Sequence, residues 1–201
     1  DLPAAPLAGW YDLHEGDMSM KPLLGGKGAG IAEMNRIGVP VPDAFTVTTH
    51  ACVAAMNNDG AWPEGLEGQI EAGLARLEER TGRTLGGAEK PLLVSVRSGA
   101  IQSMPGMMDT ILNLGLTPAG VQTMGQKFGD MRFAWDLYRR LVQMFSKVVL
   151  DVPGELFEEV IDGVRKELGV KTDAGITAEG WEKCAVEFKK LVERHTGAPF
   201  P

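Results

Sequence analysis

The sequence has 201 residues, a formal net charge of −7 and a hydrophobic share of 44%. This hydrophobic share is typical of a globular protein, and a negative charge without a basic tract argues against a nucleic-acid-binding surface. No apolar run is long enough for a membrane-spanning helix, so we expect a cytoplasmic protein without a membrane partner. Cys52 and Cys184 lack the spacing of metal ligands, and we expect both thiols to be reduced and buried.

The first informative stretch in chain order is LLGGKGAG (23–30), which follows a short predicted strand over 10–13. It predicts a glycine turn that leads into a helix over 28–37, with Lys27 at the helix start. A helix N-terminus offers free N–H groups and a favourable dipole to an anion, and Lys27 would add a charge. The stretch matches neither the P-loop pattern nor GxGxxG, so taken alone it favours a structural glycine turn with an exposed lysine.

A strand over 44–48 is predicted next, followed by a helix that begins after Thr48 or Thr49 and ends at Met56. Apolar residues at helical spacing then predict an amphipathic helix over 66–80. A polar connection leads from this helix to the following strand.

The stretch LLVSVRSGAIQSMPGMMDTILNL (92–114) predicts a buried strand over 92–96 that delivers Arg97 at its end, then a loop and a second apolar run. Side chains alternate along a strand, so Arg97 shares a face with Ser95, at the strand end where α/β sheets often bind ligands. The glycines and hydroxyl groups of the loop let backbone N–H groups approach a ligand, which indicates an anion site. A surface hairpin with a solvated arginine is an equally open interpretation.

After Leu116 the sequence predicts helices alone, which divides the chain into an α/β part (1–116) and an all-α part (117–201). The predicted helices of the all-α part cover 117–128, 131–150, 154–168 and 177–195.

Two of these helices carry a clear apolar face. The helix over 131–150 is expected to bury Phe133, Leu137, Leu141, Met144 and Val148. The last helix carries Trp181, Ala185, Phe188 and Val192 at the same spacing. The pair Arg139 and Arg140 is expected to lie on a solvated face.

Four segments resemble the amino-terminal, nucleotide-binding part of the pyruvate, phosphate dikinase family. They are LLGGKGAGIAEM (23–34), GVPVPDAFTVTT (38–49), SVRSGAIQSMPGMMDTILNLGL (95–116) and RFAWDLYRRLVQMFSKVVLDVP (132–153). The third is the most specific, because the related phosphoenolpyruvate synthases share the strand and the arginine but continue with a different, Phe-Ala-Gly-type loop. The resemblance implies that the α/β part is a lobe of an ATP-grasp-like nucleotide-binding domain.

The resemblance also implies which residues form the nucleotide site. Lys27 and Arg97 would contact the phosphates of ATP, with Arg97 in a catalytic role, and the loop with Gly99 and Gly106 would close over them. An arginine can bind two phosphate oxygens at once and a lysine acts as a point charge, which suits a polyphosphate. The implied nucleotide-binding residues are Lys27, Arg97, Gly99, Gly106, Asp109 and Thr110.

Enzymes of this family convert ATP, phosphate and pyruvate to AMP, diphosphate and phosphoenolpyruvate through a phosphohistidine on a swivelling domain. The resemblance implies that the Mg²⁺ ligands, the histidine domain and the pyruvate-binding barrel lie outside this chain. We therefore expect an inactive fragment of a homodimeric transferase. The alternatives are the ATP-binding lobe of a phosphoenolpyruvate synthase or a glucan-type dikinase, and a non-catalytic interaction module.

Overall fold

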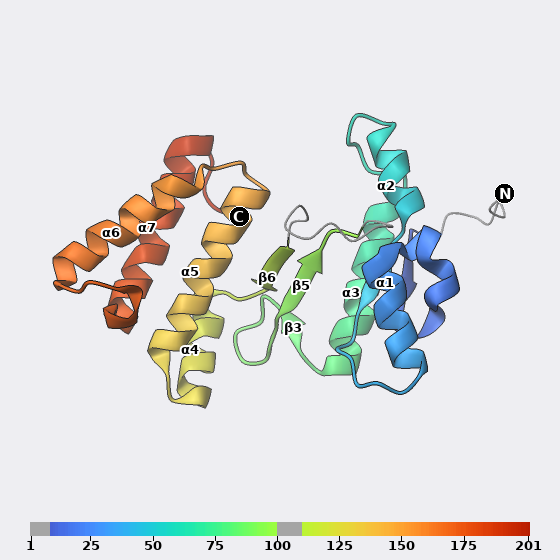
Figure 1. Ribbon diagram of the computed structural model, residues 1–201, viewed down its shortest axis with the longest axis horizontal. Coiled ribbons are helices and arrows are strands. Elements are labelled where there is room, and N and C mark those ends of the chain that lie inside the picture. The colour runs from blue at the N-terminus through green and yellow to red at the C-terminus, as the bar shows by residue number, and fades with distance from the viewer. Residues whose placement is uncertain (1–8, 100–109) are drawn as a thin grey trace. The chain divides into compact units, whose positions relative to one another are not determined.

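The computed structural model describes residues 9–99 and 110–201 and shows a mixed α/β structure that is rich in helices (Figure 1). The described strands form small sheets of two strands each. Two compact units are distinguished, one from residues 9–82 with 98–99, the other from 83–97 with 110–201. The second unit thus combines strands that precede residue 116 with the helices that follow it.

The first unit joins one antiparallel strand pair to three helices. Its elements are β1 (Trp10–Asp12), two 3-10 helices (Leu13–Glu15 and Met18–Met20), α1 (Lys21–Arg36), β2 (Phe45–Val47), α2 (Thr49–Met56) and α3 (Leu66–Thr81). β1 pairs with β2, and α3 packs on both strands. The Thr48 hydroxyl caps α2 by accepting the N–H of Ala51 at 3.2 Å, which confirms the predicted start of this helix.

Cys52 corrects one expectation for this unit. It lies on α2 and is exposed, whereas the sequence predicts two buried thiols. α2 is a short helix of mostly small apolar residues, and only Ala51 on it is buried. The sequence of such a helix does not reveal which side faces the core, because its own apolar residues lie on all of its sides.

The second unit begins with two strand pairs. β3 (Thr84–Leu85) lies parallel to β4 (Pro91–Leu92), and β5 (Val94–Arg97) pairs antiparallel with β6 (Thr110–Leu114). The strand predicted over 92–96 is therefore interrupted, and it is buried only in part, since Leu92 is buried but Val96 is 48% exposed. The hairpin alternative describes this segment better than the buried strand does.

The remaining elements of the second unit are α4 (Pro118–Phe128), α5 (Met131–Val148), α6 (Gly154–Leu168), a 3-10 helix (Asp173–Gly175) and α7 (Ala178–Thr196). No strand occurs between residues 115 and 201, all of which the structure describes, as predicted. α5 packs against α4 and α7, and α6 packs against α7 (Figure 1). Phe157 of α6 and Phe188 of α7 meet edge to face in the core, with 4.8 Å between ring centres.

The predicted inner face of α5 is right only in part. Of its five residues, Leu141 is buried and Leu137 packs half-buried against the core, but Phe133 and Val148 are exposed. The buried residues of α5 are Ala134, Trp135, Tyr138, Arg139, Leu141, Val142 and Ser146. Apolar residues lie on several sides of this helix, and the positions of α4 and α7 decide which of them are covered.

The arginine pair of α5 divides between core and solvent. Arg140 has a side chain that is 57% exposed, as predicted, whereas Arg139 is only 7% exposed. The prediction is wrong for Arg139 because a carboxylate one turn earlier and an amide one turn later satisfy its guanidinium inside the unit.

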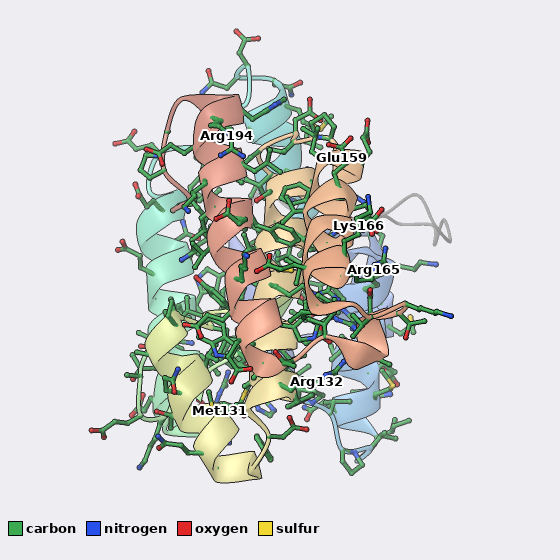
Figure 2. All side chains as sticks on the ribbon, turned by 90° about the vertical axis from the view of Figure 1, so that its left-hand side faces the viewer. Met131, Arg132, Glu159, Arg165, Lys166 and Arg194 are labelled. Atoms are coloured by element: carbon green, nitrogen blue, oxygen red, sulfur yellow. The ribbon has the colours of Figure 1, made fainter. Side chains whose placement is uncertain are left out.

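Two arginines hold the connection between α6 and α7 (Figure 2). Arg132 donates to the carbonyl oxygens of Ile176 and Asp173, each at 2.7 Å. Arg165 donates to the Asp173 carboxylate at 3.1 Å. These bonds tie the connection to α5 and α6.

Candidate functional site

The glycine-rich stretch forms a sharp bend inside α1. Gly25 has φ 71° and ψ 171°, which is not helical, and the residues on both sides of it are helical. This backbone region is almost restricted to glycine. The predicted glycine turn therefore exists, but it lies at Gly25, and helical backbone resumes earlier than the predicted start at Gly28.

Lys27 lies two residues after this bend, and its side chain is partly exposed. Its ammonium group donates to the carbonyl oxygen of Ser98 at 3.3 Å. An ammonium group has three N–H donors, so a single carbonyl leaves donor capacity for a further oxygen ligand. The contact links Lys27 to the first residue after the strand that carries Arg97.

Arg97 is the last residue of β5, as predicted, and its side chain is exposed. Its Nε donates to the Ser95 hydroxyl at 3.1 Å, so the two side chains share a face of the strand, as alternation requires. Thr110 is the partner of Arg97 in the antiparallel register. The exposed guanidinium is accessible to an anionic ligand, and its hydrogen bond to the Ser95 hydroxyl orients it.

The structure places the predicted site residues in two groups. Lys27 and Gly99 belong to the first unit, and Arg97 and Thr110 belong to the second. The Gly99 backbone approaches Gly25 so closely that a Cβ added to Gly25 would lie 3.4 Å from the Gly99 carbonyl carbon. Two further predicted residues, Gly106 and Asp109, lie outside the described residues.

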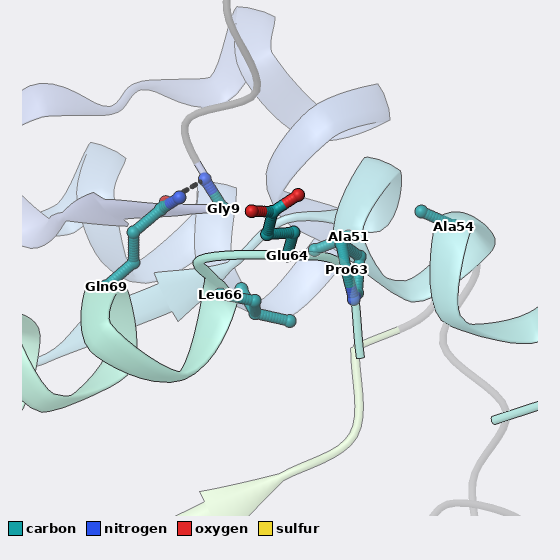
Figure 3. Close-up of a pocket in the computed structure, with 7 residues that line it drawn as sticks. All are labelled: Gly9, Ala51, Ala54, Pro63, Glu64, Leu66 and Gln69. Carbon is teal, nitrogen blue, oxygen red and sulfur yellow. Dashed lines mark hydrogen bonds between the residues drawn. The ribbon is translucent and has the colours of Figure 1, made fainter. Parts of the chain in front are cut away.

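A small pocket of the first unit does not fit a nucleotide. Figure 3 shows it lined mainly by small and apolar residues of α2, α3 and the segment before α3, with the Gly9 N–H donating to the Gln69 amide oxygen at 2.6 Å. Its volume of about 40 Å³ has room for water but falls far short of the roughly 300–1,000 Å³ typical of small-molecule sites.

The described residues 9–99 and 110–201 contain no group of three or more His, Cys, Asp or Glu side chains placed to hold a metal ion. Within the same ranges, no helix has both the length and the apolar character needed to cross a membrane.

Comparison with known proteins identifies relatives of the chain. Residues 21–80, which include the bend and Lys27, match the sequence family described as the AMP/ATP-binding domain of pyruvate phosphate dikinase. The pyruvate, phosphate dikinase of Rhizobium meliloti is 46% identical over 187 residues, which are 93% of this chain and 21% of that protein. The dikinase of Clostridium symbiosum is 47% identical over 197 residues, 97% of this chain and 22% of that protein.

The chain is homologous to a region of pyruvate, phosphate dikinase. A maize relative, pyruvate, phosphate dikinase 2, is 46% identical over 187 residues and supports the same relationship. The chain spans about a fifth of the length of these relatives. The dikinase resemblance noted from the motifs is therefore confirmed.

Sequence reasoning predicted the glycine turn but missed two features of the dikinase-like segment 21–36. One is the helical backbone that precedes Gly25, which makes the turn a bend within a longer helix. The other is the contact between Lys27 and the Ser98 carbonyl, which has no signal in the sequence because it joins residues 71 positions apart.

Proposed function

We propose that this chain is the part of a pyruvate, phosphate dikinase that binds the phosphates of ATP, with Lys27 and Arg97 as the phosphate ligands. The observation that carries the proposal is the match of residues 21–80 to an AMP/ATP-binding domain, because Lys27 lies inside the matched segment. The partly exposed ammonium of Lys27 and the exposed guanidinium of Arg97 support it, since both are accessible to an anion.

The two cations have different parts in the proposed site. The planar guanidinium of Arg97 binds two phosphate oxygens at once, while the ammonium of Lys27 acts as a point charge. Phosphoryl transfer depends chiefly on positioning and on neutralising charge that develops on the phosphate oxygens, so Arg97 acts as the catalytic residue. Gly99, Gly106, Asp109 and Thr110 complete the proposed nucleotide site.

The proposed fold for the first part of the chain is an ATP-grasp-like lobe. The proposed reaction of the whole cytoplasmic, homodimeric enzyme interconverts ATP, phosphate and pyruvate with AMP, diphosphate and phosphoenolpyruvate. A phosphohistidine domain and a pyruvate-binding barrel are its proposed partners. Mg²⁺ would neutralise phosphate charge, with ligands outside this chain, so the chain alone produces no AMP from these substrates.

The proposal is tested by titrating the chain with ATP and AMP in a calorimeter. Lys27→Ala is expected to weaken ATP binding about tenfold, which is about 1.4 kcal/mol, and to weaken AMP binding less, because AMP lacks the β- and γ-phosphates. Lys171→Ala, which removes an exposed lysine from the connection after α6, serves as the matched control. Equal ATP affinities for the two variants would show that Lys27 does not bind phosphate.

A further inference from the structure

The glycines around Lys27 have different surroundings. Gly25 has a positive φ of 71°. A Cβ on Gly28 would lie 2.8 Å from the Thr46 side chain of β2, a distance that side chains do not adopt. A Cβ on Gly30 would meet nothing within 4 Å. The stretch therefore contains one glycine required by backbone conformation, one required by packing, and one with no steric requirement.

We propose that Gly25 is a positioning residue for Lys27, holding the lysine ammonium against the Ser98 carbonyl so that it is ready to receive a phosphate. The inference rests on the proposed phosphate-binding function of Lys27 and adds that the bend at Gly25 orients this lysine. The residue acts through Lys27 and does not itself bind the ligand.

Conformation, and not space, is what excludes a side chain at Gly25. The nearest atoms to an added Cβ are the carbonyl carbon, Cα and carbonyl oxygen of Gly99, at 3.4, 3.5 and 3.6 Å, which are ordinary contact distances. The backbone angles, by contrast, lie in a region that L-residues avoid. A D-residue has the mirror-image backbone preference, so D-alanine suits these angles.

The chain on both sides of the bend is anchored, so the bend cannot move without disturbing its neighbours. Before it, Leu24 is buried and the Thr49 hydroxyl donates to the Pro22 carbonyl at 2.8 Å. After it, Ala29 and Ala32 are buried in the first unit. An L-residue at position 25 that returned to ordinary angles would have to shift one of these anchored segments.

Lys27 is the group that such a shift displaces. It follows the bend by two residues, and its 3.3 Å bond to the Ser98 carbonyl spans from α1 to a residue beside Gly99. The Gly99 backbone also lies near the bend, at 3.4–3.6 Å from the position that a Cβ of residue 25 would take. An uninterrupted helix through position 25 would direct Lys27 elsewhere.

The test compares L- and D-alanine at position 25 in the full 201-residue chain, made by ligating a synthetic peptide 1–51 to a fragment that begins at Cys52. Affinity for the β,γ-imido analogue of ATP is measured by calorimetry. Gly25→Ala is expected to weaken binding about tenfold, which is about 1.4 kcal/mol. Gly25→D-Ala and the matched control Gly30→Ala are expected to stay within about twofold of wild type. Equal losses for L- and D-alanine would overturn the proposal.

A double variant separates an effect of Gly25 on the position of Lys27 from a general effect on stability. In the Lys27→Ala background, Gly25→Ala is expected to cause no further loss of affinity, because the group that it positions is gone. Additive losses would show that Gly25 acts independently of Lys27. Far-UV circular dichroism and urea unfolding check the fold of each variant.

The side-chain NMR shifts of Lys27, recorded without nucleotide, distinguish failure of this proposal from failure of the proposed function. They are expected to move in Gly25→Ala and not in Gly30→Ala. If they move while Lys27→Ala leaves nucleotide affinity unchanged, Gly25 positions the lysine but the phosphate-binding function fails. If they do not move, Gly25 does not position Lys27, whatever the affinity of the lysine variant.

Discussion

The guanidinium of Arg139 lies over the ring of Trp181, 4.2 Å from its centre, inside the second unit. The same group is 2.7 Å from the Asp136 carboxylate and donates to the Gln143 amide oxygen at 3.0 Å. A buried charge is tolerated when its hydrogen bonds and its countercharge are both supplied, and the aromatic face adds a further attraction. Arg139 thus joins α5 to α7 as part of the core.

Replacing Arg139 is therefore expected to destabilise the second unit. Arg139→Ala should lower the free energy of unfolding by about 2–4 kcal/mol, because it opens a cavity against Trp181 and removes the ion pair with Asp136. Arg140→Ala is the matched control, since Arg140 contacts the same carboxylate at 3.0 Å from an exposed position and should cost less than about 1 kcal/mol. Urea unfolding of both variants is the measurement, and similar losses would contradict a core role for Arg139.

The two thiols are expected to react at very different rates. Cys184 is buried, and burial raises the pKa of its thiol to about 11, while Cys52 is exposed. The thiolate is the reactive form, so a thiol reagent at pH 8 should modify one cysteine per folded chain and two in denaturant. Cys52→Ser should abolish the rapid reaction. Rapid labelling of that variant without denaturant would show that Cys184 is accessible.

Asp12 is expected to make the first unit sensitive to acid. Burial alone would raise the pKa of Asp12, but the His14 N–H at 3.2 Å and the Arg80 guanidinium at 2.7 Å outweigh it and hold that pKa below the ordinary 3.8. Because the pKa of Asp12 is lower in the folded than in the unfolded state, its carboxylate stabilises the fold. This stabilisation is present above the unfolded pKa of about 4 and is lost as the pH falls through the folded pKa.

The free energy of unfolding, measured between pH 2 and pH 6, tests this contribution of Asp12 to stability. Asp12→Asn should lower stability at pH 6 and reduce the loss on acidification. Asp43→Asn is the control, since Asp43 lies 3.5 Å from the same arginine but is more exposed, and it should have the smaller effect. An unchanged acid dependence in Asp12→Asn would exclude Asp12 as a main cause of acid sensitivity.

The proposed phosphate ligands are tested most directly in a full-length dikinase that contains this region. Arg97→Ala should slow the ATP half-reaction by about 30- to 1000-fold, the effect of losing about 2–4 kcal/mol of transition-state stabilisation. Lys27→Ala should act in the same direction. Arg97 is exposed, so its removal should leave the fold stable.

The pyruvate half-reaction, which the proposal assigns to another domain, serves as the internal control for both variants and should remain unchanged. If the ATP half-reaction of each variant stays within about threefold of wild type, less than 1 kcal/mol, then neither residue binds phosphate in the transition state.

Local signals in the sequence predicted where most helices begin and end. Thr177 caps α7 by accepting the Gly180 N–H at 3.2 Å, and α6 ends before Gly169, both as predicted. Caps and glycine stops work over a few neighbouring residues, so the sequence alone contains the information. The four segments that resemble the dikinase family, above all 95–116, likewise sufficed to recognise the relationship, because such motifs depend on residue order.

Only the tertiary structure decided which faces are buried and which distant groups meet. α5 has apolar residues on several sides, and contact with α4 and α7 buries Trp135 and Arg139 while Phe133 stays exposed. The bond between Lys27 and the Ser98 carbonyl joins residues far apart in sequence. Such contacts depend on how whole elements pack, since packing selects among several helix faces that are locally equivalent.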